Sequence, residues 1–317
     1  MTESDRTQTP KHIPVLLNEC IEALQIKPDG IYLDGTLGMG GHSFEIASRL
    51  DTGRLICIDR DETAIERAGR RLAPFGEKVR LVHGNFSDAA AILDELGIEA
   101  ADGMLFDLGV SSPQLDEAER GFSYMADAPL DMRMDPGDRL TAAEIVNTWP
   151  QEELRRILFA YGEERYAPLI AAAIVRRRAQ QPIETTLELV DVIRSAMPQK
   201  ALREKQHPAK RSFQAIRIAV NDELGSVDRM LARAIDRLNP GGRLAVITFH
   251  SLEDRIVKNA MAQAARGCTC PPEFPVCVCG KKPTVRLITK KPITSAEAEL
   301  EENPRARSAK LRVAEKL

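Results

Sequence analysis

The chain has 317 residues, of which 43% are hydrophobic and 29% are charged, with 20 Gly and 19 Pro. This composition excludes collagen-like, low-complexity and wholly disordered proteins, and the length suits one large domain or two ordinary ones. Aromatic residues at 4% argue against a protein that reads single-stranded nucleic acid mainly by stacking bases on aromatic platforms, and a formal net charge of −3 is not typical of a nucleic-acid-binding protein.

The first twelve residues are polar and lack the apolar core of a secretory signal, and no apolar run approaches the ~18 residues that span a bilayer. We therefore expect a cytoplasmic protein without membrane contact.

From residue 31 to residue 106, short β-rich runs alternate with helical patterns, which is typical of βαβ units and a parallel sheet. The predicted strands are 31–33, 55–58, 79–82 and 104–106, and the predicted helices between them are 44–50, 64–72 and 89–96. A fifth strand, 244–249, comes only after the turn 239–242.

The long connection between the fourth and fifth strands must carry structure of its own. Helical patterns fill it, at 142–160, 169–179, 187–196 and 213–238. The sequence thus predicts a discontinuous sheet domain, residues 1–114 plus 207–317, with a helical subdomain inserted at 115–206. A helix at 252–265, a cysteine-rich loop and strands at 285–289 and 309–313 complete the sheet domain.

The first strand ends in a glycine-rich turn that precedes a helix and contains Gly38, Gly40 and Gly41. Glycines at such a turn let the backbone approach a ligand, and Asp59 at the end of the next strand is placed to accept hydrogen bonds from a ribose diol. Together they indicate a nucleoside-bearing cofactor. The dinucleotide fingerprint fails at Ser43, no P-loop exists, and Asp34 adds a negative charge, so S-adenosylmethionine with its sulfonium and ammonium fits best.

Two further positions line the predicted pocket. Phe86 follows the third strand, where its ring either faces the adenine or packs in the core. Asp107 ends the fourth strand at the crevice where ligands of α/β sheets bind.

Nine stretches along nearly the whole chain carry a resemblance to a known family: 12–17, 40–43, 107–114, 120–123, 130–135, 207–211, 213–217, 249–255 and 303–308. In these motifs the chain resembles the RsmH (MraW) family of S-adenosylmethionine-dependent enzymes, which methylate N4 of a cytidine in the decoding centre of 16S ribosomal RNA. The resemblance implies a Rossmann-like class I methyltransferase sheet and an inserted subdomain that helps to recognise the RNA. It also implies that the cofactor is contacted by Gly40, Gly41, His42, Asp59, Phe86, Asp107 and Gln114.

The group that activates the weakly nucleophilic N4 amine stays open. Many amino-group methyltransferases carry [DNS]-P-P-[YF] after the fourth strand, whereas residues 107–110 read Asp-Leu-Gly-Val here. Asp107 is one candidate to contact the target base. His250, directly after the fifth strand, is the other, and its alternative role is to cap the next helix.

Local charge favours RNA despite the acidic total. Residues 1–100 carry a net charge of −6, whereas residues 194–217 carry +6 and residues 280–317 carry +5. Positive segments of this kind suit phosphate contacts, although a solvated helix face is the commoner explanation of a charge run. Lys210, Arg211 and Arg217 are the RNA-binding candidates.

Four of the six cysteines, Cys268, Cys270, Cys277 and Cys279, lie within twelve residues. They form either a zinc site or a proline-stiffened loop with reduced thiols, and the sequence assigns no metal. Cys20 and Cys57 fall on apolar faces and are expected in the core.

The leading prediction is thus an S-adenosylmethionine-dependent methyltransferase that acts on 16S ribosomal RNA, as free RNA or within the small ribosomal subunit. A homodimer is compatible with the sequence. An NAD-dependent oxidoreductase is opposed by the failed dinucleotide fingerprint, and a non-catalytic nucleic-acid-binding factor by the intact turn and Asp59.

Overall fold

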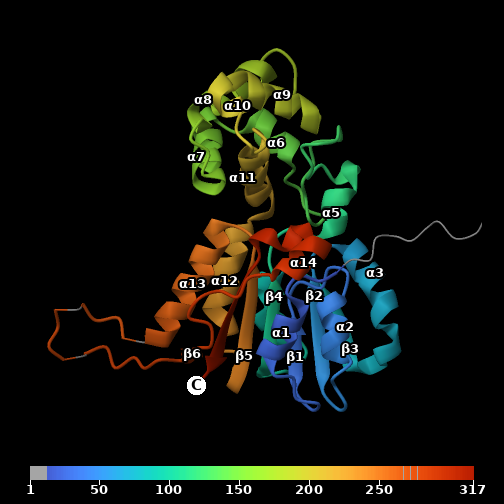
Figure 1. The fold of residues 1–317 in the computed structure, drawn as a ribbon, viewed down its shortest axis with the longest axis vertical. Coiled ribbons are helices and arrows are strands. Elements are labelled where there is room, and N and C mark those ends of the chain that lie inside the picture. Colours follow the sequence, from blue (N-terminus) through green and yellow to red (C-terminus); the bar gives the residue numbers. More distant parts are fainter. Residues whose placement is uncertain (1–12, 267, 272, 277) are drawn as a thin grey trace, which may run out of the picture. The chain divides into compact units, whose positions relative to one another are not determined.

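The computed structural model describes residues 13–266, 268–271, 273–276 and 278–317. The chain forms two compact units (Figure 1). The sheet unit comprises the described residues up to Gly109 and from Ser226 onward, and the helical unit comprises Val110–Gly225. The second boundary falls later than residue 206, because helix α11 (Lys210–Asn221) packs against α7 (Gln151–Gly162) in the helical unit.

Seven strands of the described chain form one sheet in the order β3-β2-β1-β4-β5-β7-β6. The first five strands in this order are parallel to one another, and β7 pairs antiparallel with both β5 and β6. The strands are β1 (Ile31–Asp34), β2 (Arg54–Asp59), β3 (Val79–His83), β4 (Ala101–Asp107), β5 (Leu238–Thr248), β6 (Val285–Leu287) and β7 (Lys310–Lys316). The α/β fold predicted from the alternating pattern is confirmed.

Both faces of the sheet are buried, because successive residues of a strand point to opposite faces. Leu33 packs in one core with residues of α4, α12 and α13, whereas its neighbour Tyr32 packs in a second core with residues of α1, α2 and α3. Cys20 and Cys57 are buried in this second core, as predicted. The helices of the sheet unit are α1 (Leu17–Leu24), α2 (Gly41–Ala47), α3 (Glu62–Leu72), α4 (Ala89–Glu95), α12 (Glu223–Ala234, whose first residues belong to the helical unit), α13 (Ser251–Arg266) and α14 (Glu297–Glu302).

The helical unit has its own core, in which Leu158, Ile174 and Ile216 are fully buried. An independent core of this kind lets the unit fold around its own apolar side chains. Besides α7 and α11 its helices are α5 (Ser112–Asp116), α6 (Ala142–Thr148), α8 (Ala167–Arg178), α9 (Thr186–Ala196) and α10 (Gln199–Leu202). None of the described helices in either unit is both long and apolar enough to cross a membrane.

Two predicted helices are each broken in the structure. The pattern over 142–160 forms α6 and α7, because Pro150 precedes α7 and cannot continue the hydrogen bonding of α6. The pattern over 213–238 forms α11 and α12, with Asp222 between them at φ 47°. The predicted turn 239–242 lies inside β5, where the register with β4 shifts and Gly241 has φ 79°.

Candidate active site

Three strands of the sheet unit end in aspartate at the same edge. Asp34 ends β1, Asp59 ends β2 and Asp107 ends β4. Because β1 pairs in parallel with both β2 and β4, the carboxyl ends of these strands lie together, where α/β sheets bind ligands.

The glycine-rich turn connects β1 to α2 and has left-handed backbone at Gly38 (φ 50°) and Gly40 (φ 70°), which glycine adopts without steric cost. The Gly38 N–H donates to Asp59 Oδ2 at 2.7 Å, so the turn is fixed to the end of β2. Gly40 is the N-cap residue of α2, and no side chain caps this helix. The first N–H groups of α2 are therefore available to a ligand at this edge.

Asp59 accepts a second backbone hydrogen bond, from the Asp61 N–H at 2.9 Å. Burial raises the pKa of Asp59 to about 6, against the opposing effect of the bonds from Asp61 and Gly38. A carboxylate has about four acceptor positions, so these two bonds leave capacity for the hydroxyls of a ribose.

Asp34 is buried, with 2% of its surface exposed, and it organises the start of the turn. Its carboxylate accepts from Ser43 Oγ at 2.6 Å and from the Thr36 N–H at 3.1 Å. Burial raises its pKa in spite of these bonds. The Thr36 hydroxyl in turn accepts the Asp107 N–H at 2.6 Å, which connects the turn to the end of β4.

Asp107 has a buried carboxyl oxygen, Oδ1, without a hydrogen-bond partner among the described residues. Burial, together with the negative charges of Asp34 and Glu253, raises the pKa of Asp107 to about 8. At neutral pH the carboxyl is therefore mostly protonated in the ligand-free protein. A cation next to it would favour the ionised form.

His42 lies within α2 and faces Asp107. Its Nε2 is 3.0 Å from the Val15 carbonyl oxygen, which can only accept, so Nε2 carries the proton. Burial lowers the pKa of His42 to about 4, and the ring is neutral. Its Nδ1 therefore carries a lone pair, 4.0 Å from Asp107 Oδ2.

Phe86 begins the short 3-10 helix η2 (Phe86–Asp88) after β3. Its ring meets the buried Phe106 ring edge to face, with centroids 6.1 Å apart. Phe86 is only partly buried, so one part of the ring packs on the core and another stays accessible.

His250 precedes α13, where it forms a cap with Glu253. The Glu253 N–H donates to His250 Nδ1 at 3.4 Å, and Glu253 Oε2 accepts the Phe249 and His250 N–H groups at 3.0 and 3.3 Å. His250 Nε2 lies 3.1 Å from Glu253 Oε1 without hydrogen-bond alignment. The geometry thus matches the capping role that the sequence left open for His250, with histidine in place of the usual serine or threonine.

The remaining predicted residues lie in the helical unit. Gln114 is buried, and its Oε1 accepts the Ser111 N–H at 3.0 Å in the cap of α5. Lys210 is exposed, and Arg211 donates to the Glu163 carbonyl at 3.2 Å. Arg217 makes a bidentate ion pair with Glu223, with both contacts at 2.8 Å, so its guanidinium is committed within the unit.

Sequence reasoning missed Thr36, which connects the turn to Asp107, and it noted Ser43 only as a mismatch to the dinucleotide fingerprint. The signal was present, since both hydroxyls lie in or next to the glycine-rich turn. Their partners are Asp107, on another strand, and Asp34, at the start of the same turn, and spacing along the chain does not reveal these contacts.

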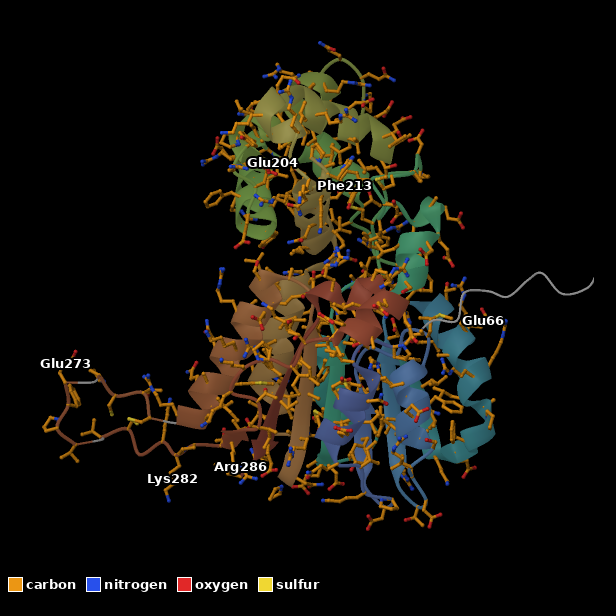
Figure 2. All side chains as sticks on the ribbon, viewed as in Figure 1. Glu66, Glu204, Phe213, Glu273, Lys282 and Arg286 are labelled. Atoms are coloured by element: carbon orange, nitrogen blue, oxygen red, sulfur yellow. The ribbon has the colours of Figure 1, made fainter. Side chains whose placement is uncertain are left out.

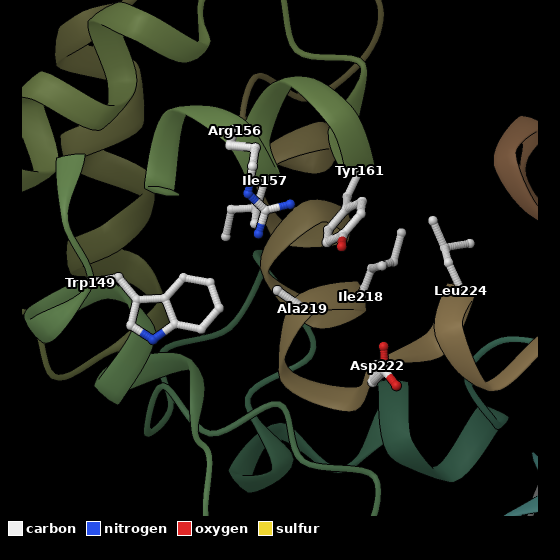
Figure 3. A pocket seen from close by; sticks show the side chains of 8 residues that line it. All are labelled: Trp149, Arg156, Ile157, Tyr161, Ile218, Ala219, Asp222 and Leu224. Carbon is white, nitrogen blue, oxygen red and sulfur yellow. The ribbon is translucent and has the colours of Figure 1, made fainter. Parts of the chain in front are cut away.

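An open pocket in the helical unit is the other notable feature (Figure 3). The side chains of α7 and α11 and their neighbours line it: Trp149, Arg156, Ile157, Tyr161, Ile218, Ala219, Asp222 and Leu224. The Arg156 guanidinium lies 5.8 Å from the centroid of the Tyr161 ring. Aromatic rings beside a cation form a surface on which a nucleobase can stack.

These side chains fit S-adenosylmethionine in the sheet unit. Asp59 has free acceptor capacity for the ribose, and no side chain caps the first backbone N–H groups of α2. Asp34 and Asp107 have raised pKa values, which a cationic ligand would lower. An ammonium and a sulfonium supply that charge.

Replacement of Gly40 by alanine is expected to destabilise the protein by about 1–2 kcal/mol and to weaken cofactor binding. The backbone must keep its left-handed conformation, and the new Cβ would lie 3.1 Å from the Ala68 Cβ. Gly97→Ala is the matched control, because Gly97 has φ 68° and a Cβ there meets nothing within 4 Å. Urea unfolding and calorimetric binding of S-adenosylmethionine measure both effects. Equal losses of stability and affinity in the two variants would contradict a specific role of the turn.

Comparison with known proteins confirms the resemblance that the motifs indicated. A family model described as the MraW methylase family matches residues 9–317. Ribosomal RNA small subunit methyltransferase H of Heliobacterium modesticaldum is 58% identical over 308 residues, which cover 96% of this chain and 98% of that protein. The protein of the same name from Symbiobacterium thermophilum is 59% identical over 307 residues, 96% of each chain.

Among solved structures, an rRNA methylase from Streptococcus thermophilus covers 99% of both chains at 12% identity, with a TM-score of 0.42. A likeness at that level carries no argument about function, so the assignment depends on the family model and the sequence relatives. On that basis the chain belongs to the MraW methylase family of S-adenosylmethionine-dependent methyltransferases.

Proposed function

We propose that this protein methylates N4 of a cytidine in the decoding centre of 16S ribosomal RNA, acting in the cytoplasm on the small ribosomal subunit. The observation that carries the proposal is the match over 96% of the chain to proteins named ribosomal RNA small subunit methyltransferase H. The choice of N4 of cytidine follows from the family resemblance of the motifs.

The acceptor amine sets the chemical problem. The lone pair of a cytosine N4 is delocalised into the ring, so the amine attacks only when it is aligned and when an acceptor holds one of its hydrogens. S-adenosylmethionine, when bound, supplies a methyl group on a sulfonium, which is an activated leaving group.

We assign the acceptor role to Asp107. Its Oδ1 is buried without a partner in the described chain, at the end of β4 where the ligands of such sheets meet. As the N4–methyl bond forms and the sulfur–methyl bond breaks, the amine loses one proton. The ionised Asp107 carboxylate holds that hydrogen and accepts it. His250 supports the loop after β5 through its cap with Glu253, and its own contact with the base is the competing hypothesis.

The helical unit carries the features proposed for RNA binding. Five basic side chains of the 194–217 segment are exposed in the described structure, namely Arg194, Lys200, Arg203, Lys205 and Lys210. Their positive charges suit phosphate contacts, and the pocket beside Trp149 and Tyr161 suits an unpaired base. Arg211 can join the phosphate contacts through the part of its guanidinium that does not contact Glu163. Arg217 pairs with Glu223, so in this proposal it contributes to RNA binding by stabilising the helical unit and not by a direct phosphate contact.

The test is methyl transfer to small subunits that lack the modification, with free 16S RNA as a parallel substrate and mass mapping of the modified nucleotide. We expect one methyl group on N4 of a decoding-centre cytidine. Product at N3 or C5, or on another base, would refute the assignment of N4.

Replacement of Trp149 by alanine is expected to weaken RNA binding about tenfold and to leave cofactor binding unchanged, because one base-stacking contact is worth roughly 1–3 kcal/mol. Phe159→Ala is the matched control, since Phe159 is an exposed aromatic residue of α7 that does not line the pocket. Filter binding to subunits at fixed salt measures the effect. If both variants bind as the unmodified protein does, the pocket does not contact RNA.

A further inference from the structure

The segment between α13 and β6 extends away from the sheet unit (Figure 1), and it has no helix or strand among its described residues. Its apolar side chains are exposed, with Phe274 51%, Val276 70% and Val278 73% accessible. Figure 2 shows Glu273 near the far end and Lys282 near the return to β6. A backbone hydrogen bond from Thr284 to Ala264, 2.9 Å long, closes its base. The described part of the segment thus has no apolar core to hold it in one conformation.

Thiols from the two sides of this segment converge. The Sγ atoms of Cys268, Cys270 and Cys279 all lie within 4.8 Å of one another. The Cys268 and Cys279 sulfurs are 3.8 Å apart. Tetrahedral zinc with Zn–S bonds of ~2.3 Å requires sulfur–sulfur edges of ~3.8 Å, which matches this pair.

The surroundings also suit a metal-bound sulfur. The Val278 N–H donates to Cys270 Sγ at 3.3 Å, and a donor of this kind stabilises negative charge on a metal-bound sulfur. Arg266, Lys281 and Lys282 provide positive charge along the same segment, whereas its one described carboxylate, Glu273, lies near its far end. At Cys20 and Cys57, by contrast, burial raises the pKa of both thiols well above its usual value.

We propose that Cys268, Cys270 and Cys279 bind one zinc ion and that this ion fixes the conformation of the segment. Each thiol releases its proton to solvent when the metal binds, and no oxidant or reductant takes part. Cys277 lies outside the described residues, so the proposal counts three protein thiolates and leaves the fourth position unassigned.

Metal analysis of the full-length protein, purified under reducing conditions and without chelators, is the first test. We expect roughly one zinc ion per chain, and a loss of at least about tenfold in zinc content in a Cys268→Ser, Cys270→Ser, Cys279→Ser triple variant. Cys20→Ala and Thr269→Ala are the controls, since one removes a thiol in the core and the other an exposed side chain in the same segment. Both are expected to retain the metal.

A second measurement does not depend on activity or on the metal content after purification. Chelation should speed tryptic cleavage after Lys281 in the unmodified protein, and added zinc should reverse this effect, with neither response in the triple variant. Cobalt(II) in place of zinc should give the intense visible bands of tetrahedral thiolate coordination. Iron and acid-labile sulfide in the protein, a Cys268–Cys279 disulfide, or thiols that bind no added zinc would each overturn the proposal.

Discussion

Replacement of Asp107 by asparagine is expected to lower methyl transfer by about 10²-fold or more, the usual size of a positioned acid–base group. The variant keeps the backbone N–H that donates to the Thr36 hydroxyl, so the connection between β4 and the glycine-rich turn survives. What it loses is a carboxylate oxygen that can accept a proton from the amine. Single-turnover assays with saturating cofactor and subunits measure the chemical step directly.

His250→Ala discriminates between the two hypotheses for the base contact. If His250 acts only as the cap of α13, its replacement should cost stability of about 1 kcal/mol and little rate. If His250 contacts the base, the rate should fall with subunit binding unchanged. Normal turnover in both Asp107→Asn and His250→Ala would remove both residues from the mechanism.

The pH dependence follows from the same carboxyl. The pKa of Asp107 in the folded protein, about 8, lies above the value of 3.8 expected in the unfolded chain. The folded state therefore binds the extra proton, and stability falls as the pH rises from about 4 to about 8. A cationic cofactor favours the ionised form, so its binding should release protons and tighten as the pH approaches 8.

Asp107→Asn is consequently expected to be more stable than the unmodified protein at pH 8 while it is far less active. Urea unfolding at pH 5 and pH 8, and calorimetry in buffers of different ionisation enthalpy, measure the two effects. Identical proton release in the variant would show that another group titrates.

The strands and their terminal aspartates were predictable from sequence, because hydrophobic runs and strand-to-helix turns are local patterns. Asp34, Asp59 and Asp107 each follow a buried run directly. The breaks in the helices were not predicted, since the apolar spacing continues across Pro150 and Asp222 even though the backbone cannot.

The electrostatic state of the site was beyond sequence reasoning for a different reason. Burial raises the pKa of Asp107 most, and Asp34 and Glu253, which come from distant parts of the chain, add to this effect because they lie near it. Arg217 looked like a phosphate contact, yet Glu223 neutralises it. Charge alone therefore overestimates the number of basic side chains that are available to RNA, and the exposed members of the 194–217 segment are better candidates.

Replacement of Asp59 by asparagine is expected to weaken S-adenosylmethionine binding about 10- to 100-fold, because charge-assisted hydrogen bonds are worth roughly 1.5–3 kcal/mol and each 1.4 kcal/mol is a factor of ten. The amide keeps one oxygen as an acceptor for the Gly38 or the Asp61 N–H, so the turn is expected to remain folded. Isothermal calorimetry at pH 7 measures the change in affinity.

Asp61→Asn is the matched control, since it removes a carboxylate two residues away and keeps the side-chain oxygen that caps α3 by accepting the Thr63 N–H. Its affinity should change less than about threefold, because the buried Asp61 carboxylate is engaged in the cap of α3. The pKa of Asp59, about 6, adds a second criterion. Ribose hydroxyls donate to the ionised carboxylate, so below about pH 6 the affinity of the unmodified protein should fall more steeply than titration of Asp107 alone requires. This additional steepness should vanish in Asp59→Asn but persist in Asp61→Asn. If Asp61→Asn loses affinity to the same extent, the negative potential of the loop matters and Asp59 makes no specific contact with the ribose.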